Sequence, residues 1–170
     1  MIRVIAGAAI AALALVSGVV SMDPISTMPE GYRDWPLISL ARIGSPLNDL
    51  RAKLGNPVTM RAYKNRTLPF PDGAIIARLA WKQATSEENN QAFARGAEGE
   101  MGAVTESFVA GPATNVQFMI KNSKKYASTG GWGFAQFTNG KPDTGAVLKT
   151  CFGCHAPAKD HDFVFTHYAP

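Results

Sequence analysis

The only two cysteines of the chain lie in one short patch near the C-terminal end, in the segment TCFGCHAP. Cys151 and Cys154 are separated by two residues, and His155 follows directly. C-x-x-C-H is the attachment signature of c-type haem. The two thiols add to the two vinyl groups on one edge of the porphyrin, and the histidine becomes an axial ligand of the iron. The motif therefore predicts one haem c, covalently held by Cys151 and Cys154, with His155 as the iron ligand.

Other uses of the cysteine pair fit the sequence less well. A zinc site would need both cysteines and two of the three histidines, so that one short segment would have to fold back on itself. The histidines are His155, His161 and His167. A redox-active C-x-x-C pair would be expected between a strand and a helix, at the other end of the chain. A disulfide between these cysteines would close a very small loop and add little stability.

The function of such a haem depends on the second axial position of the iron. A methionine or histidine there gives a six-coordinate electron carrier, whereas an open position allows ligand binding or catalysis. The sequence offers five candidates for a closing ligand, each of which is also an ordinary core or surface residue: Met60, Met101, Met119, His161 and His167. The sequence alone leaves this choice open.

The N-terminal residues have the pattern of a secretory signal. Arg3 precedes an uninterrupted run of apolar and small residues from Ile5 to Val20, and Ser-Met-Asp-Pro ends the run. We expect residues 1–22 to be a signal peptide and residues 23–170 to form one haem domain in the periplasm. An uncleaved membrane anchor is the alternative, because the run is marginally long enough to span a bilayer.

The composition is that of an ordinary globular domain. The chain has 170 residues, of which 46% are hydrophobic and 18% charged, with a formal net charge of +4. No block of five or more lysines and arginines occurs, which argues against nucleic acid as a partner. The mild basicity is typical of a solvated surface and would also suit an acidic protein partner.

The clearest strand signal is the segment AIIARLAWK, residues 74–82. Alternation along a strand places Ile75, Ala77, Leu79 and Trp81 on a core face, and places Arg78 on a second face among small and apolar residues. Further strands are predicted over residues 58–63, 101–109, 115–120 and 132–138, with a turn at 68–73 and a final extended piece at 162–168.

Two helices and one long loop complete the prediction. Ser45 and Pro46 are typical of a helix start, so a helix is predicted from there to Leu54, closed by Gly55. A second short helix over residues 143–151 would deliver Cys151, and residues 83–100 are expected to form a long loop. The predicted fold class is α+β, a mostly antiparallel β-sheet with two or three short helices and a C-terminal haem-attachment segment.

With these segments in view, the sequence resembles the cytochrome P-460 family, which includes the cytochromes c′-beta. The resemblance spans about residues 31–170 and rests on GYRDWPLIS, LPFPDGAIIARLAWK, NVQFMIKNSKKYASTGGWGFAQF, CFGCH and DFVFTHYAP. It implies an exported c-type haem protein, usually a homodimer, with five-coordinate iron, one histidine ligand and an open distal side.

The family has two functional branches. In one branch a lysine is crosslinked to the haem and the protein oxidises hydroxylamine; in the other no crosslink forms and the haem binds nitric oxide or carbon monoxide. The crosslinking lysine falls at Arg78 here, and a protonated guanidinium is a poor nucleophile. Lys82 lies about 13 Å further along the strand and is not expected to replace it.

The resemblance therefore implies the uncrosslinked branch. The expected function is binding of a small diatomic ligand, nitric oxide above all, with electron exchange with a periplasmic redox partner as an accompanying role. A hydroxylamine-oxidising enzyme and a six-coordinate electron carrier are the alternatives. Arg78 could pair with a haem propionate or donate a hydrogen bond to a bound ligand. Phe70 is a candidate cap over the distal side, as are Phe134 and Phe137, although core packing is the usual role of such residues.

Overall fold

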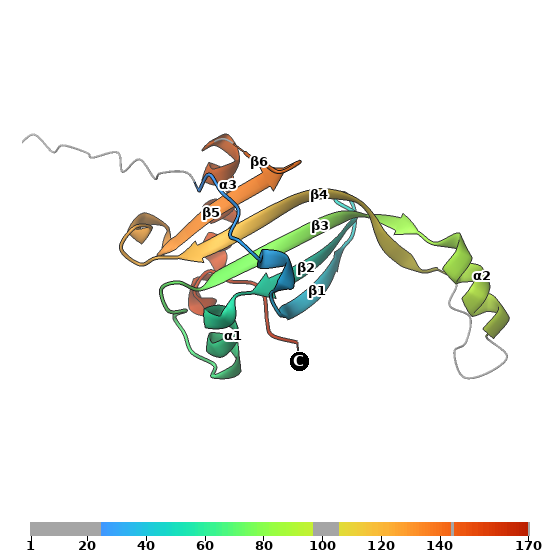
Figure 1. The fold of residues 1–170 in the computed structure, drawn as a ribbon, viewed down its shortest axis with the longest axis horizontal. Coiled ribbons are helices and arrows are strands. Elements are labelled where there is room, and N and C mark those ends of the chain that lie inside the picture. The colour runs from blue at the N-terminus through green and yellow to red at the C-terminus, as the bar shows by residue number, and fades with distance from the viewer. Residues whose placement is uncertain (1–24, 97–105, 144, 170) are drawn as a thin grey trace, which may run out of the picture.

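One antiparallel sheet of six strands organises the chain, and its strands follow one another in sequence order from edge to edge (Figure 1). The computed structural model describes residues 25–96, 106–143 and 145–169. The strands are β1 Leu37–Ile43, β2 Asp49–Gly55, β3 Ile75–Thr85, β4 Phe108–Lys121, β5 Trp132–Thr138 and β6 Lys141–Pro142. The predicted α+β class with a mostly antiparallel sheet is confirmed.

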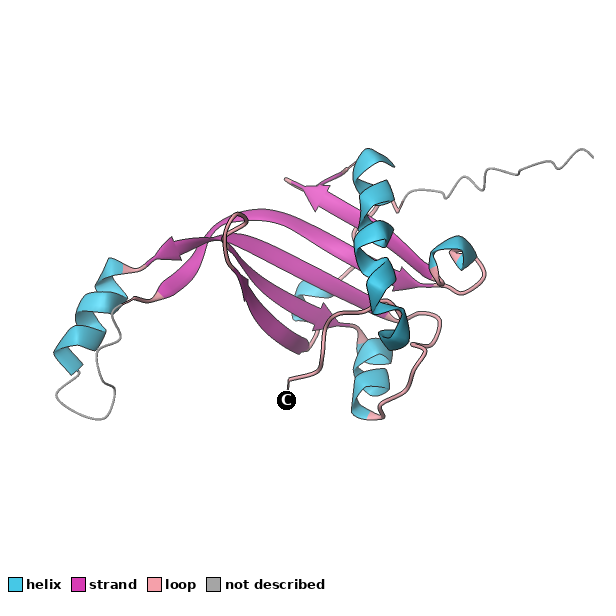
Figure 2. Cartoon of the chain, turned by 180° about the vertical axis from the view of Figure 1, so that it is seen from behind, coloured by secondary structure: helices cyan, strands magenta, loops and turns pink. Residues whose placement is uncertain are grey.

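Short helices lie around the sheet. They are α1 Pro57–Lys64, α2 Glu87–Gly96 and α3 Gly145–His155, together with the 3₁₀ turns η1 Tyr32–Asp34, η2 Ala127–Thr129 and η3 Ala156–His161. Helix α3 crosses one face of the sheet, whereas α2 stands at the tip of an arm that β3 and β4 form beyond the other strands (Figure 2). Within the described residues, no helix is long and apolar enough to cross a membrane. The predicted signal, residues 1–22, lies outside the described part of the chain.

The central strand β3 is buried on both faces. Ala77 and Leu79 pack in a cluster with Phe118 and Phe137, which confirms the predicted core face. The opposite face is covered as well, because Ile76 belongs to a second cluster against which Cys151 of α3 packs. The face that carries Arg78 is therefore an interior surface under α3.

Two consecutive elements were predicted with the wrong type of secondary structure. The segment predicted as a helix after Ser45 forms a turn and then strand β2, and the segment predicted as a strand from Val58 to Tyr63 is helix α1. The leucines at 50 and 54 fit a two-residue period as well as a helical one, and pairing with β1 and β3 decides for the strand. The helix begins further along the chain, after β2, where Asn56 is the N-cap and Pro57 is the first helical residue.

The predicted loop over residues 83–100 is also wrong in part. Strand β3 continues to Thr85, and α2 begins directly afterwards. Ser86 Oγ accepts the backbone N–H of Asn89 at 3.2 Å, and two glutamates occupy the first helical turn. These are ordinary signals of a helix start. Of the strand predicted over 101–109, the part from Phe108 belongs to β4, and residues 101–105 lie outside the described part.

The other predictions hold with adjusted limits. Strands are confirmed at 74–82, 115–120 and 132–138, and the helix predicted over 143–151 extends to His155. The final extended piece predicted over 162–168 is wrong at its start, where Asp162 and Phe163 have left-handed backbone conformations, and the described residues after them form no strand of the sheet.

The side chain of Asn56 ties α1 to the sheet. Its Oδ1 accepts the backbone N–H of Thr59 at 3.0 Å and that of Ile75 at 3.1 Å, and its Nδ2 donates to the carbonyl of Gly73 at 2.8 Å. One buried amide therefore caps the helix and also satisfies the backbone at the entrance to β3.

We expect Asn56→Ala to lower the free energy of unfolding by about 2 kcal/mol, because a helix cap and buried hydrogen bonds are lost together. Urea denaturation followed by circular dichroism would measure the change. Asn65→Ala is the matched control, since Asn65 is exposed at the other end of α1. It should change the free energy by no more than about 0.5 kcal/mol, and equal losses in the two variants would contradict the role given to Asn56.

Candidate functional site

Helix α3 presents the cysteine motif beside the sheet. Cys151 and Cys154 are three residues apart on the helix, and such residues lie on the same side. Cys151 is half-buried against the core, whereas Cys154 is exposed, and the two cysteines are not joined by a disulfide. A group attached through both sulfurs would therefore lie along this side of α3.

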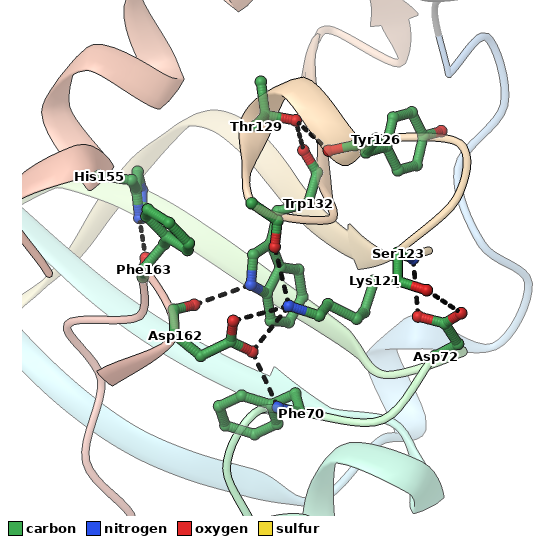
Figure 3. A network of polar contacts seen from close by, with 11 residues as sticks. Phe70, Asp72, Lys121, Ser123, Tyr126, Thr129, Trp132, His155, Asp162 and Phe163 are labelled. Atoms are coloured by element: carbon green, nitrogen blue, oxygen red, sulfur yellow. Dashed lines mark hydrogen bonds and ion pairs between the residues drawn. The ribbon is translucent and has the colours of Figure 1, made fainter. Parts of the chain in front are cut away.

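The imidazole of His155 is held at one of its two nitrogens. Nδ1 lies 2.7 Å from the backbone carbonyl oxygen of Phe163 (Figure 3). A carbonyl can only accept, so Nδ1 carries the proton and Nε2 keeps its lone pair. The ring also packs against Phe134 and Phe165, with centroid distances of 5.2 and 5.3 Å. This tautomer and this support are what a metal-binding histidine requires.

Arg78 lies in a row of polar side chains that crosses the sheet. Lys53 on β2, Arg78 on β3, Gln117 on β4 and Gln136 on β5 are register partners. The Arg78 guanidinium donates to Gln117 Oε1 at 2.8 Å and to Asn115 Oδ1 at 3.0 Å. Gln117 in turn donates to Gln136. Neutral amides therefore fix Arg78, and neither of these two partners balances its charge.

Positive charge gathers around Arg78. Burial and the nearby Arg51 lower the pKa of Arg78 to about 10. Burial, Arg51 and Arg78 also lower the pKa of Lys53. The carboxylate of Asp49 pairs with Arg51 at 3.0 Å and with Lys82 at 3.4 Å. Burial raises the pKa of Asp49, but the hydrogen bonds from Arg51 and Lys82 and their positive charges together lower it by more, so the net shift is downward.

This charge distribution fits a haem group. In the described part of the chain, the buried Nε atoms of Arg51 and Arg78 have no hydrogen-bond partner. Cys151 packs against the cluster that contains Ile76, which lies two residues from Arg78 on the same face of β3, so the guanidinium and the first cysteine of the motif are on the same side of the sheet. A haem carries two propionate carboxylates, and these anionic groups would balance the excess of positive charge around Arg78. Arg51, Lys53 and Arg78 are the residues that would hold those carboxylates.

The three predicted aromatic caps lie in different places. Phe70 is buried, with its ring against Tyr63 at 5.0 Å and Trp132 at 5.7 Å. Phe137 packs with Phe118 in the cluster on the face of the sheet away from α3. Phe134 alone of the three has a ring contact with His155. The structure thus places Phe134 at the histidine and Phe70 in the core, and the capping role of Phe70 stays a prediction.

The candidates for a second axial ligand of the iron make other contacts or lie outside the described part of the chain. Met60 and Met119 are buried in the core cluster. His161 and His167 are exposed and meet edge to face with ring centroids 5.6 Å apart, and residue 101 lies outside the described part. Among the described residues, no group of three His, Cys, Asp or Glu side chains is placed to hold a metal ion, which disfavours the zinc interpretation.

The sequence led to the prediction of the cysteines, His155 and Arg78 as site residues, but not of the groups that hold His155 and Arg78 in position. The carbonyl of Phe163 leaves no mark in a sequence, because every residue has one. The amides that hold Arg78 could have been found by pairing the predicted strands, since Gln117 and Gln136 have the same alternation as Arg78.

Comparison with known proteins gives one finding. A family model described as Cytochrome P460 matches residues 29–166. The match includes all six strands, helix α3 and the segment that supports His155. A sequence search among curated proteins found no match.

Arg78→Gln should lower the haem midpoint potential, because losing a buried positive charge stabilises the more positive ferric state. Redox titration followed by absorption spectroscopy would measure the shift. Lys82→Gln is the matched control, since it removes one charge from the same strand at an exposed side chain that already pairs with Asp49. An equal shift in the two variants would show that Arg78 has no special relation to the haem.

Proposed function

Because the chain belongs to the cytochrome P460 family, whose members are c-type haem proteins, we propose that it binds a small diatomic ligand at a single haem c. Cys151 and Cys154 form the two thioether bonds, and His155 is the one axial ligand of a five-coordinate iron. Nitric oxide is the first ligand to test. When bound, the haem supplies an iron atom that takes up such a gas reversibly and exchanges single electrons.

The observation that carries this proposal is the hydrogen bond between His155 Nδ1 and the carbonyl of Phe163. It commits Nδ1 as a donor and leaves Nε2 as the only ring nitrogen available for iron. It also makes the imidazole more basic and fixes the plane of its ring. The neighbouring cysteine, Cys154, lies one residue before it on the same helix.

The residue at the crosslink position favours an uncrosslinked haem. Arg78 keeps its proton at neutral pH even with its lowered pKa of about 10, and its guanidinium donates to Gln117 and Asn115. Lys82, the other basic side chain on this face of β3, donates to the carbonyl of Leu47 at 2.8 Å. Neither of these two side chains of β3, the strand that carries the crosslink position, is a free amine, which favours ligand binding over hydroxylamine oxidation.

The surroundings of the candidate ligands favour an open distal side over a six-coordinate carrier. Met60 and Met119 would have to leave the core to reach an iron atom, which would expose apolar surface and create cavities. His161 and His167 follow the motif closely and would have to cross the haem plane.

The proposal includes export and assembly. Residues 1–22 act as a secretory signal, so the mature domain works in the periplasm, as c-type haem attachment requires. A homodimer is the proposed assembly, and an acidic redox partner protein is the proposed source or acceptor of electrons.

Mass spectrometry of the purified protein after proteolysis tests the attachment. We expect one haem mass on the peptide that contains Cys151 and Cys154, and none on peptides from residues 74–82. Cys154→Ser should leave a single thioether, so that one vinyl group remains on the porphyrin and the absorption band of the haem in alkaline pyridine moves to longer wavelength than in the unmodified protein. A haem link to the 74–82 segment would contradict the proposal and favour the hydroxylamine-oxidising branch.

The absorption spectrum of the ferrous protein tests the coordination. A five-coordinate, uncrosslinked haem should give an ordinary high-spin spectrum that changes on addition of nitric oxide or carbon monoxide. Sharp low-spin bands that resist carbon monoxide would establish a six-coordinate carrier. A strongly red-shifted Soret band together with turnover of hydroxylamine would establish the enzyme.

A further inference from the structure

We propose that Lys121 and Asp162 form a buried latch that positions the proximal histidine, acting through the backbone carbonyl of Phe163. The inference rests on the proposed function only in taking His155 as the iron ligand. Figure 3 shows the contacts that connect these residues. Lys121 ends strand β4, whereas Asp162 and Phe163 follow η3, so the latch joins segments 41 residues apart.

The ion pair is buried, and both of its charged groups also make hydrogen bonds to the backbone. Lys121 Nζ lies 2.7 Å from Asp162 Oδ1 and 2.9 Å from Oδ2, and the two side chains are only 5% and 7% exposed. The ammonium also donates to the carbonyl of Gly130 at 3.0 Å and lies 4.9 Å from the ring centroid of Trp132. Asp162 Oδ2 accepts the backbone N–H of Phe70 at 2.8 Å. Both charges therefore have partners that hold them in one place.

The backbone beside this pair has a conformation that must be held. Asp162 has φ 52° and Phe163 has φ 64°, and left-handed conformations are unfavourable for residues with a Cβ. Trp132 Nε1 donates to the carbonyl of Asp162 at 2.8 Å, and the N–H of Phe163 donates to the carbonyl of Ala158 at 2.8 Å. Both bonds hold the peptide group between Asp162 and Phe163. The next peptide group, which carries the Phe163 carbonyl, is held by the N–H of Val164, which donates to the carbonyl of His161 at 3.1 Å. Together these bonds direct the Phe163 carbonyl at His155.

Gly130 contacts both Lys121 and the ring of Phe163. The ring of Phe163 lies so close that a Cβ at Gly130 would be 2.0 Å from its Cε2 atom, and Gly130 itself has φ +65°. The carbonyl of Gly130 accepts from Lys121. One glycine therefore holds the lysine through its backbone oxygen and gives room to the ring of the residue whose carbonyl binds His155.

The latch controls how strongly the His155 imidazole donates electrons to the iron. A hydrogen bond from Nδ1 to a well-placed carbonyl increases the electron donation of the imidazole through Nε2. Buried ion pairs are seldom the most stable way to fill a core, and their best-attested use is to specify one arrangement. Here the specified arrangement is the position of one carbonyl oxygen, so Lys121 and Asp162 are positioning residues for the iron ligand.

The test uses Lys121→Met and Asp162→Asn in the haem-loaded protein. We expect the iron–histidine stretching band in the resonance Raman spectrum of the ferrous form to move to lower frequency in both variants. Gly130→Ala leaves both ionic residues in place but displaces Phe163, and should move the band in the same direction. In Gly130→Ala, which changes no charge, we also expect the haem midpoint potential to move in the positive direction, because a weaker donor stabilises the ferric state less.

Thr59→Val is the matched control. Thr59 is fully buried, and its hydroxyl is hydrogen-bonded to the backbone of Ile75 and to Asn56, away from the latch. The variant should lose stability but keep the iron–histidine frequency and the midpoint potential of the unmodified protein. Latch variants that match this control in both measurements would overturn the proposal.

A purified chain that carries no haem would refute the proposed function but would still allow the latch to be tested. The ring nitrogens of His155 would then be observed by ¹⁵N NMR in the full chain. The Nδ1–H tautomer should dominate in the unmodified chain and lose its preference in Lys121→Met and Asp162→Asn. Equal tautomer populations in all three chains would overturn the latch.

Discussion

The position of one backbone carbonyl governs the proposed chemistry of this protein. The oxygen of Phe163 decides which nitrogen of His155 carries the proton, and so decides which nitrogen can bind a metal. That oxygen belongs to a pair of left-handed residues which would not adopt this conformation in an isolated peptide. The sheet supplies the missing constraint, because Lys121 and Trp132 reach the same turn from neighbouring strands. The segment around His155 is therefore organised by contacts remote in the sequence.

The sheet also determines the electrostatics around the cysteine motif. Its register places a lysine, an arginine and two glutamines side by side on the face that α3 covers. Neutral amides orient Arg78 without neutralising it, so its charge stays available to an anionic group. An amine at this position would be a nucleophile, whereas the guanidinium is a fixed cation. Under the proposed function, the residue type at this one position would decide between the two chemistries.

Some of these features could be predicted from the sequence because their signals are local. The spacing of Cys151, Cys154 and His155 has one dominant interpretation, and the alternation around Arg78 identified β3 and its core face. The error in β2 has a physical cause, since leucines at 50 and 54 satisfy two periods and only pairing with β1 and β3 chooses between them. The capping role of Asn56 could have been found locally, from the amide that precedes Pro57. The Lys121–Asp162 pair could not, because nothing in either neighbourhood indicates the other.

The unbalanced cations near Cys151 have a consequence for maturation. Before haem is added, the folded chain must hold Arg51, Lys53 and Arg78 close together with less negative charge than positive, and this repulsion opposes compaction. The two propionates of a bound haem would act as counter-ions, so loading the cofactor and completing the fold would be thermodynamically linked. The proposed prosthetic group would then be a structural component of the domain as well as its reactive centre. The apoprotein should be the conformationally looser form, open enough for the attachment machinery to reach both thiols.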